Sequence, residues 1–243
     1  DVSVPFGIKQ IAPNAFYEND SVKEVKLSPT VFAVGERAFM GCAELTDVEL
    51  NTGLVIIADE AFANCPELSS VSTPVTISRV GDGAFINCSK LSVAKLQGNN
   101  LSIGKGAFAH CDALQVVLMS DGVSMLCDDS FSNNPKLEYA SVPQGVISVT
   151  HQAFDECPLL TVVCDKGSFV DTALTGNVTV SYNRGDANIN GRVDIMDATE
   201  IQLNIAGIKQ LPNKNLVYMD ADFDTETSIL DATYVQLVIA KLL

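Results

Sequence analysis

Apolar residues recur along most of the chain in a unit of 23 residues. A phenylalanine marks each unit, and in six of the seven units an alanine stands directly before it. A leucine or valine follows six residues after each phenylalanine. The marking residues are Phe16, Phe39, Phe62, Phe85, Phe108, Phe131 and Phe154. A period that holds over so many units predicts a stack of similar coils, each of which buries its apolar face against its neighbours.

Each unit also contains a short stretch in which apolar and polar residues alternate, as between Leu45 and Leu50. This pattern predicts one strand per coil, and stacked coils then form a parallel sheet along one side of the solenoid. The segment around each Ala-Phe pair forms the opposite wall, with the ring in the interior. Residues 167–182 break the period and are expected to cap the stack.

A compact residue, either Cys or Asn, stands three positions after each phenylalanine. Both residue types can offer a donor to the backbone turn beneath them. Stacked coils place equivalent Cα atoms about 5 Å apart with parallel Cβ vectors, so we expect free thiols along this ladder. The ladder residues are Asn19, Cys42, Cys65, Cys88, Cys111, Asn134 and Cys157.

Two acidic segments of similar sequence follow the repeats, at 186–197 and 220–231. Each carries oxygen-bearing side chains at positions 1, 3, 5, 9 and 12, the EF-hand arrangement that surrounds a hard cation with oxygens. Each segment leads into a helix of matching sequence, but no amphipathic helix leads into either segment. The two loops differ, because Thr225 stands at position 6 of the second loop, where a positive φ is usual and a β-branched residue is strained.

The repeats resemble the BspA-like leucine-rich repeats of bacterial surface proteins over residues 8 to 166. The resemblance is carried by an Ile-Gly or Val-Gly pair, an Ala-Phe pair, a Cys and a Leu-x-x-Val-x-Leu stretch, as in Val34-Gly35, Ala38-Phe39 and Cys42. It implies a β-rich leucine-rich-repeat solenoid with a parallel sheet, over residues 1–183. Such repeats serve mostly as protein-binding or adhesion surfaces with varied targets.

The two acidic loops and their helices resemble a type I dockerin, the module that binds cohesins in cellulosome-like complexes. The resemblance implies a small α-helical dockerin over residues 184–243 with two F-hand loops and two calcium ions. It assigns the first ion to Asp186, Asn188, Asn190, the carbonyl of Arg192, Asp194 and Asp197. It assigns the second ion to Asp220, Asp222, Asp224, the carbonyl of Glu226, Ser228 and Asp231.

Dockerins of this family recognise a cohesin through loop positions 10 and 11 and through the outward face of the helix that follows. The corresponding residues are Ile195, Met196, Leu203, Ile229, Leu230, Tyr234, Leu237 and Val238. The alternative is that these apolar side chains belong to the dockerin core. The second helix presents Tyr234 and Val238 where the first presents Glu200 and Asn204, so we expect one dominant binding orientation.

The outward face of the predicted sheet carries an apolar cluster on its later coils, made of Val93, Val116, Leu118, Tyr139 and Val162. Exposed apolar clusters mark interaction surfaces, and solenoids bind through such extended faces. We therefore expect a repeat-face binding site for a protein target that the sequence does not identify. The alternative is that the cap or the dockerin covers this cluster.

Charge and catalytic motifs narrow the function further. The net charge of −15 disfavours a nucleic-acid partner, and no run of about 18 apolar residues predicts a membrane span. No Ser-His-Asp order, phosphate-binding glycine loop or histidine-rich metal cluster stands out. His110 adjoins Cys111, but that thiol belongs to the buried ladder, where thiols are inert.

We therefore expect a secreted, non-catalytic binding subunit, held outside the cell or at its surface by the cohesin module of a scaffoldin. Two alternatives stay open. One is a structural or adhesion protein that attaches the complex to a cell or substrate surface. The other is a polysaccharide-degrading enzyme.

Overall fold

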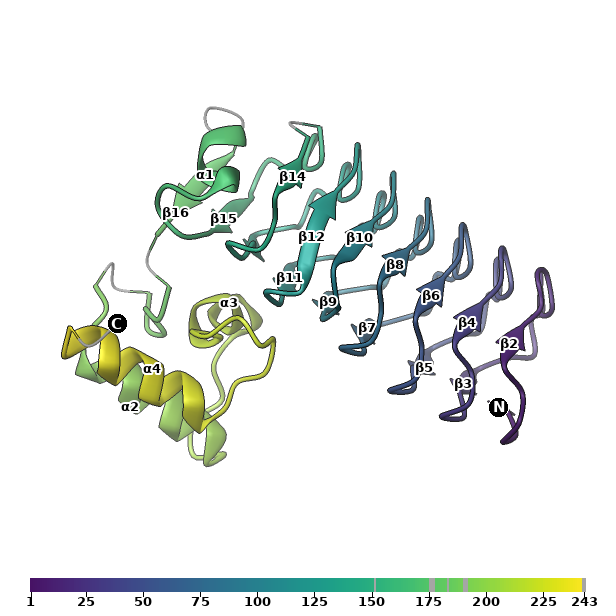
Figure 1. Cartoon of the computed structure of the whole chain (residues 1–243), viewed down its shortest axis with the longest axis horizontal. Coiled ribbons are helices and arrows are strands. Elements are labelled where there is room, and N and C mark those ends of the chain that lie inside the picture. The colour runs from purple at the N-terminus through teal and green to yellow at the C-terminus, as the bar shows by residue number, and fades with distance from the viewer. Residues whose placement is uncertain (151, 175–177, 183, 190–191, 242–243) are drawn as a thin grey trace.

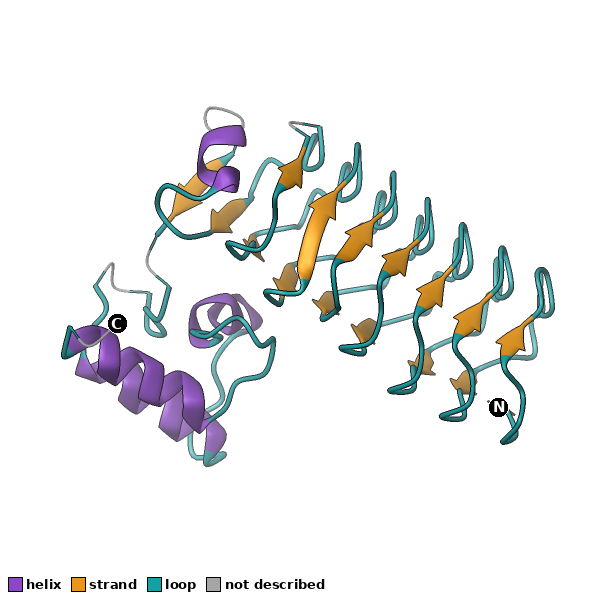
Figure 2. Cartoon of the chain, in the orientation of Figure 1, coloured by secondary structure: helices purple, strands orange, loops and turns teal. Residues whose placement is uncertain are grey.

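The computed structural model describes residues 1–150, 152–174, 178–182, 184–189 and 192–241. It shows a solenoid of stacked coils followed by a helical unit, residues 184–241, that lies against one side of the stack (Figures 1 and 2). The prediction of a parallel-sheet solenoid with 23-residue coils is confirmed.

The predicted strands form one side of the solenoid, in two parallel sheets. The first contains β1 (Val2–Ser3), β3 (Glu24–Lys26) and β5 (Asp47–Glu49). The second contains β7 (Ser70–Thr73), β9 (Val93–Leu96), β11 (Val116–Met119), β13 (Tyr139–Ser141), β15 (Thr161–Val163) and β16 (Thr179–Ser181). Equivalent residues of successive coils stand opposite one another, as Ala94 does to Val117. Side chains of one kind therefore line up in rows across the strands.

A second strand in each coil, which the sequence pattern did not predict, forms a seven-stranded parallel sheet on another side. Its strands are β2 (Gln10–Ile11), β4 (Ala33–Val34), β6 (Ile56–Ile57), β8 (Arg79–Val80), β10 (Leu101–Ile103), β12 (Val123–Leu126) and β14 (Ser148–Val149). These strands are too short for a period of two to show in the sequence. The glycine that follows lets the coils approach closely: a Cβ at Gly35 would lie 2.7 Å from the Ile11 carbonyl oxygen.

The seven phenylalanines stack as predicted in the interior of the solenoid. Neighbouring rings lie between 4.9 Å (Phe16 to Phe39) and 5.4 Å (Phe131 to Phe154) apart and within 13° of parallel. The backbone N–H of each ring residue from Phe16 to Phe131 is also satisfied by the next coil, as when Phe62 donates to the Ala84 carbonyl at 2.8 Å. Each coil therefore buries its largest side chain and pairs its backbone only in the presence of its neighbours.

The Cys and Asn ladder holds the turn of one coil to the preceding coil. The Cys88 thiol donates to the Phe62 carbonyl oxygen at 3.3 Å, and the Asn134 amide donates to the equivalent Phe108 oxygen at 3.0 Å. All seven cysteines are free. Burial raises the pKa of the Cys111 thiol to about 12, so the thiol keeps the proton that it donates.

The last coil departs from the repeat by one residue. Val162 stands opposite Ala140 in the sheet, and its side chain lies in the solenoid core. The prediction that Val162 lies on the outer face is therefore wrong, and Val163 lies there instead. A shift of one residue turns every side chain of a strand to the other face. Beyond this coil, α1 (Phe169–Ala173) is capped by Ser168 and buries Val170 against the core.

The helical unit contains α2 (Ile195–Ile205), a 3-10 turn η1 (Asn213–Asn215), α3 (Leu216–Met219) and α4 (Ile229–Ile239). Helices α2 and α4 pack side by side around Ile201 and Val235. Ile205 and Ile239 have the helical spacing of core residues in the sequence, but they are 43% and 40% exposed. Each is the last residue of its helix.

The ladder makes a prediction about Cys88. Replacement by Asn should cost less than about 1 kcal/mol, since an amide can donate the same hydrogen bond that Asn134 makes. Replacement by Leu loses the donor and overpacks a closed position, so it should destabilise by about 1–3 kcal/mol. Urea unfolding of the two variants measures the difference, and equal stability would contradict a hydrogen-bonding role for the ladder.

Candidate metal centre

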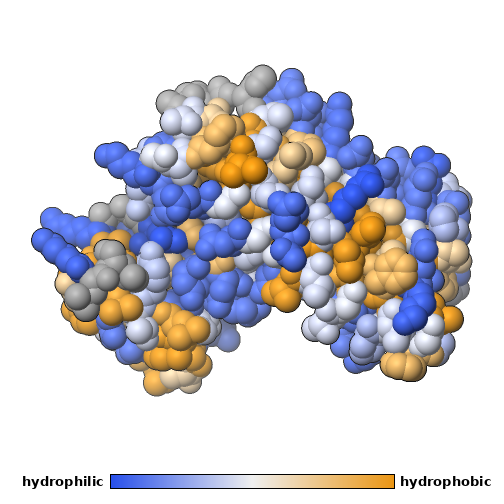
Figure 3. Space-filling model, viewed as in Figure 1, coloured by the Kyte–Doolittle hydropathy of each residue, from blue (hydrophilic) through white to orange (hydrophobic). Residues whose placement is uncertain are grey.

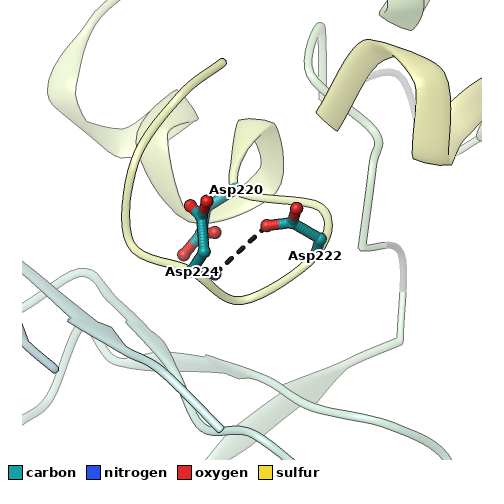
Figure 4. A group of neighbouring side chains, drawn as sticks. All are labelled: Asp220, Asp222 and Asp224. Atoms are coloured by element: carbon teal, nitrogen blue, oxygen red, sulfur yellow. Dashed lines mark hydrogen bonds between the residues drawn. The ribbon is translucent and has the colours of Figure 1, made fainter. Parts of the chain in front are cut away.

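Three carboxylates converge in the loop that follows α3. Asp220 is the residue directly after that helix, and Asp222 and Asp224 follow at alternate positions. Ligand oxygens of the three lie within 4.8 Å of one another (Figure 4). The Asp224 backbone N–H donates to Asp222 at 3.1 Å, which holds the loop in this shape. Three negative charges at this spacing repel one another unless a cation lies among them.

Burial makes the repulsion more costly. Asp220 is fully buried, and among the described residues its Oδ2 atom has no hydrogen-bond partner. Desolvation, with a further contribution from the charge of Asp231, raises the pKa of Asp220 to about 8. Burial likewise raises the pKa of Asp231 to about 6. Buried carboxyl groups with no cationic partner and an orphaned oxygen fit a site for a hard divalent cation such as calcium.

The last aspartate of each loop ties the loop to its helix in the same way. Asp231 accepts hydrogen bonds from the backbone N–H groups of Asp222 and Ser228, at 3.3 and 2.7 Å, and also from that of Ala221 at 2.7 Å. Asp197 accepts from those of Asn188 and Asp194, at 3.1 and 2.8 Å. The two loops are therefore structural duplicates at these positions, which the matching sequences indicated.

Loop one is only partly described. Asp186 and Asp197 are buried, Asn188 and Asp194 are half-buried, and Arg192 is exposed. Asn190, the predicted ligand at position 5, lies outside the described residues. The assignment of all twelve ligands stays a prediction.

Thr225 adopts the positive φ expected at position 6, with a value of 72°. A β-branched residue in this region of backbone space is strained by about 1–3 kcal/mol. Thr225 is nonetheless buried, and its N–H donates to Asp220 at 3.1 Å. Surrounding contacts must therefore hold this residue in place.

The apolar part of the outer sheet face of the solenoid is covered by the helical unit. Val217 and Tyr218 of α3 pack against Val116, Leu118 and Val163, in a cluster whose members are all buried. Figure 1 shows α3 between the strands and the α2–α4 pair. The prediction of an open binding site is thus wrong for Val116 and Leu118, and the alternative of cover by the helical unit is correct. Val93 and Tyr139 are half-buried.

Polar contacts surround this apolar interface. The ring of Tyr139 meets Tyr218 edge-on, with centroids 5.7 Å apart. Arg184 pairs with Asp165 of the solenoid at 3.3 Å and donates to the Tyr234 hydroxyl at 2.5 Å. Its guanidinium also lies over the ring of Phe223, 4.3 Å from the centroid. The sequence analysis missed Arg184, because no period or motif relates it to Asp165, which it meets only after the two parts have packed.

The residues predicted to bind a cohesin divide into two groups. Ile195, Met196, Ile229 and Leu230 are 57%, 56%, 56% and 60% exposed, so the alternative of a core role does not hold for them. They form two apolar pairs, each at the start of its helix. Leu203, Tyr234 and Leu237 are half-buried, and Val238 is exposed. Figure 3 shows apolar surface at the foot of the helical unit.

The fold and the loops together define a leucine-rich solenoid joined to a duplicated loop–helix module of the calcium-binding type. The chain belongs to the family described as the BspA type leucine rich repeat region, which matches residues 9–138 in 6 copies. Its C-terminal residues 184–243 match the dockerin type I domain. Both are binding or structural modules, and dockerins of this type bind cohesin modules and generally bind calcium.

Solved structures share the solenoid. A leucine-rich repeat protein of T. pallidum is 28% identical with a TM-score of 0.53, covering 71% of this chain and 76% of its own. A leucine-rich repeat protein of Eubacterium ventriosum is 20% identical with a TM-score of 0.56, covering 61% of this chain and 40% of its own. No curated protein matches the sequence. Within the described ranges, no helix has the length and apolar character needed to cross a membrane.

Removal of calcium is predicted to destabilise both parts of the chain. Without a cation the buried carboxylates of loop two repel one another, so the helical unit should unfold at a lower temperature. Its loss uncovers Val116 and Leu118, so the melting temperature of the solenoid should also fall. Calorimetry with calcium and with a chelator measures both transitions.

Leu118→Asp provides the matched control, because a charge in the interface prevents docking while calcium is still present. With calcium present, the solenoid of this variant should already melt at the lower temperature that the unmodified chain shows in chelator. Adding the chelator should change this melting temperature little. If the chelator leaves the melting temperature of the solenoid in the unmodified chain unchanged, the interface does not stabilise the solenoid.

Proposed function

We propose that the chain is a non-catalytic extracellular binding subunit that a cohesin-bearing scaffoldin recruits through the calcium-loaded dockerin. The proposal extends to a cellulosome-like complex for polysaccharide degradation, in which the repeats supply a protein-interaction surface. The observation that carries it is the exposure of two equivalent apolar pairs, Ile195-Met196 and Ile229-Leu230, on a domain of the dockerin type. Exposed apolar side chains at matching places favour a protein partner.

The dockerin is proposed to hold two calcium ions, one in each loop. Buried Asp220 and its neighbours Asp222 and Asp224 support the second site directly. The shared backbone contacts of Asp197 and Asp231 support an equivalent first site. Calcium neutralises the carboxylates and fixes the loop, and the chain's own residues then set the angle at which each helix and its apolar pair leave the loop.

The contacts of the helices favour two binding orientations over one. The expectation of a single orientation depended on Tyr234 and Val238, and Tyr234 is engaged by Arg184. Its counterpart Glu200 pairs with Lys209 at 2.6 Å. Tyr234 and Glu200 therefore both have partners within the chain. Val238 is exposed where its counterpart Asn204 is half-buried. The other exposed positions are nearly identical in the two helices, so either half can meet the same cohesin surface.

The free part of the repeat face is polar. Strands β3, β5 and β7 lie beyond the docked helical unit, and they expose Glu24, Lys26, Asp47, Glu49, Ser70 and Ser72. We propose that a protein target of the repeats meets this acidic half of the sheet, since the dockerin covers the apolar half. The same face could serve attachment to a cell or substrate surface.

Cohesin binding tests the two-orientation proposal. Met196→Asp or Leu230→Asp alone should weaken binding to a cohesin by about threefold or less, because the other half remains available. The double variant should lose at least about 100-fold, since a charge is then buried in either orientation. Titration calorimetry of the full chain with a panel of cohesin modules, with calcium and with chelator, gives the affinities.

Val75→Asp serves as the control. Val75 is exposed on the solenoid, so this substitution should leave the affinity for the cohesin unchanged. Loss of binding in Leu230→Asp alone would show one orientation. Unchanged binding in the double variant would show that the apolar pairs are not the cohesin surface.

A further inference from the structure

One solenoid side chain contacts the calcium loop itself. The Gln97 amide nitrogen donates to the carbonyl oxygen of Asp224 and to the hydroxyl of Thr225, both at 2.9 Å. Gln97 directly follows β9, and Lys95 on the same strand pairs with Glu226 at 3.2 Å. The solenoid thus contacts positions 5, 6 and 7 of loop two in succession.

Thr225 is the residue that most needs such support. Its φ of 72° is one that glycine adopts freely and a β-branched residue does not. One hydrogen bond from Gln97 holds the carbonyl of the peptide between Asp224 and Thr225, and the other holds the Thr225 side chain. The Thr225 N–H in turn donates to Asp220, the first ligand position, at 3.1 Å. Gln97 is therefore connected through the buried Thr225 to the carboxylate at the first ligand position, Asp220.

The packing of α3 also connects the solenoid to Asp220, at the start of the loop. Val217 and Tyr218 lie in the interface with the solenoid, and Asp220 follows two residues after them. The position of the first ligand is therefore set by the docking of α3 on the sheet. Gln97 adds a second fixed point at the middle of the loop.

We infer that Gln97 is a positioning residue for calcium binding by loop two, so that the calcium affinity of this loop depends on docking of the dockerin on the repeats. By linkage, calcium in loop two strengthens that docking by the same factor. The repeats therefore act as part of the calcium site of their own dockerin. This inference rests on the proposed calcium binding at loop two.

The test is a calcium titration of the full chain. Binding at loop two is monitored by NMR, from the backbone amide signal of residue 225. Gln97→Ala should weaken calcium binding at loop two on the order of tenfold, the effect of losing one or two ordinary hydrogen bonds. In the Thr225→Gly background the same substitution should cost about twofold or less, because glycine needs no support at a positive φ. Gln10→Ala, an exposed glutamine on β2, is the matched control and should leave the affinity unchanged.

An unchanged affinity in Gln97→Ala would overturn the inference. An equal loss in both backgrounds would overturn it too, since the effect would not pass through Thr225. Failure of the unmodified chain to bind calcium at loop two would instead contradict the proposed function. The two failures are therefore distinguishable in one experiment.

Discussion

A single coil of the solenoid is too small to enclose its own phenylalanine, so each coil depends on the one stacked upon it. The ring of Phe62 lies between two others, and its N–H is satisfied by Ala84 of the next coil. The same stacking places equivalent outer side chains in rows across the strands. Val116 and Leu118 join Tyr139 and Val163 in one surface for this reason, and that surface is where the dockerin lies.

The dockerin has two faces with different partners. Its short helix α3 packs against the sheet, while the apolar pairs at the starts of α2 and α4 remain in water. Because both modules belong to one chain, docking is intramolecular and is favoured by a high effective concentration. The solenoid therefore stabilises the module that would attach it to a scaffold, and it keeps only its polar strands free for another target.

Much of this structure could be predicted from local pattern. The 23-residue period gave the stacked phenylalanines and the Cys ladder, and the duplicated acidic segments predicted two equivalent loops. The rest depends on contacts that no period encodes. Gln97 meets Thr225 across more than a hundred residues of sequence, and the cover over Val116 follows from where α3 docks. Val162 was assigned to the wrong face because the last coil is shifted by one residue only after Phe154. Phe154 itself keeps the 23-residue spacing, so the period does not reveal the shift.

The central claim is that the dockerin lies on the repeat sheet through α3. The rings of Tyr139 and Tyr218 provide the most direct test, because they come from the two modules and meet edge-on at 5.7 Å. Nuclear Overhauser effects between their ring protons should be present with calcium and lost with a chelator. Absence of these cross-peaks in the calcium-loaded chain would contradict the account.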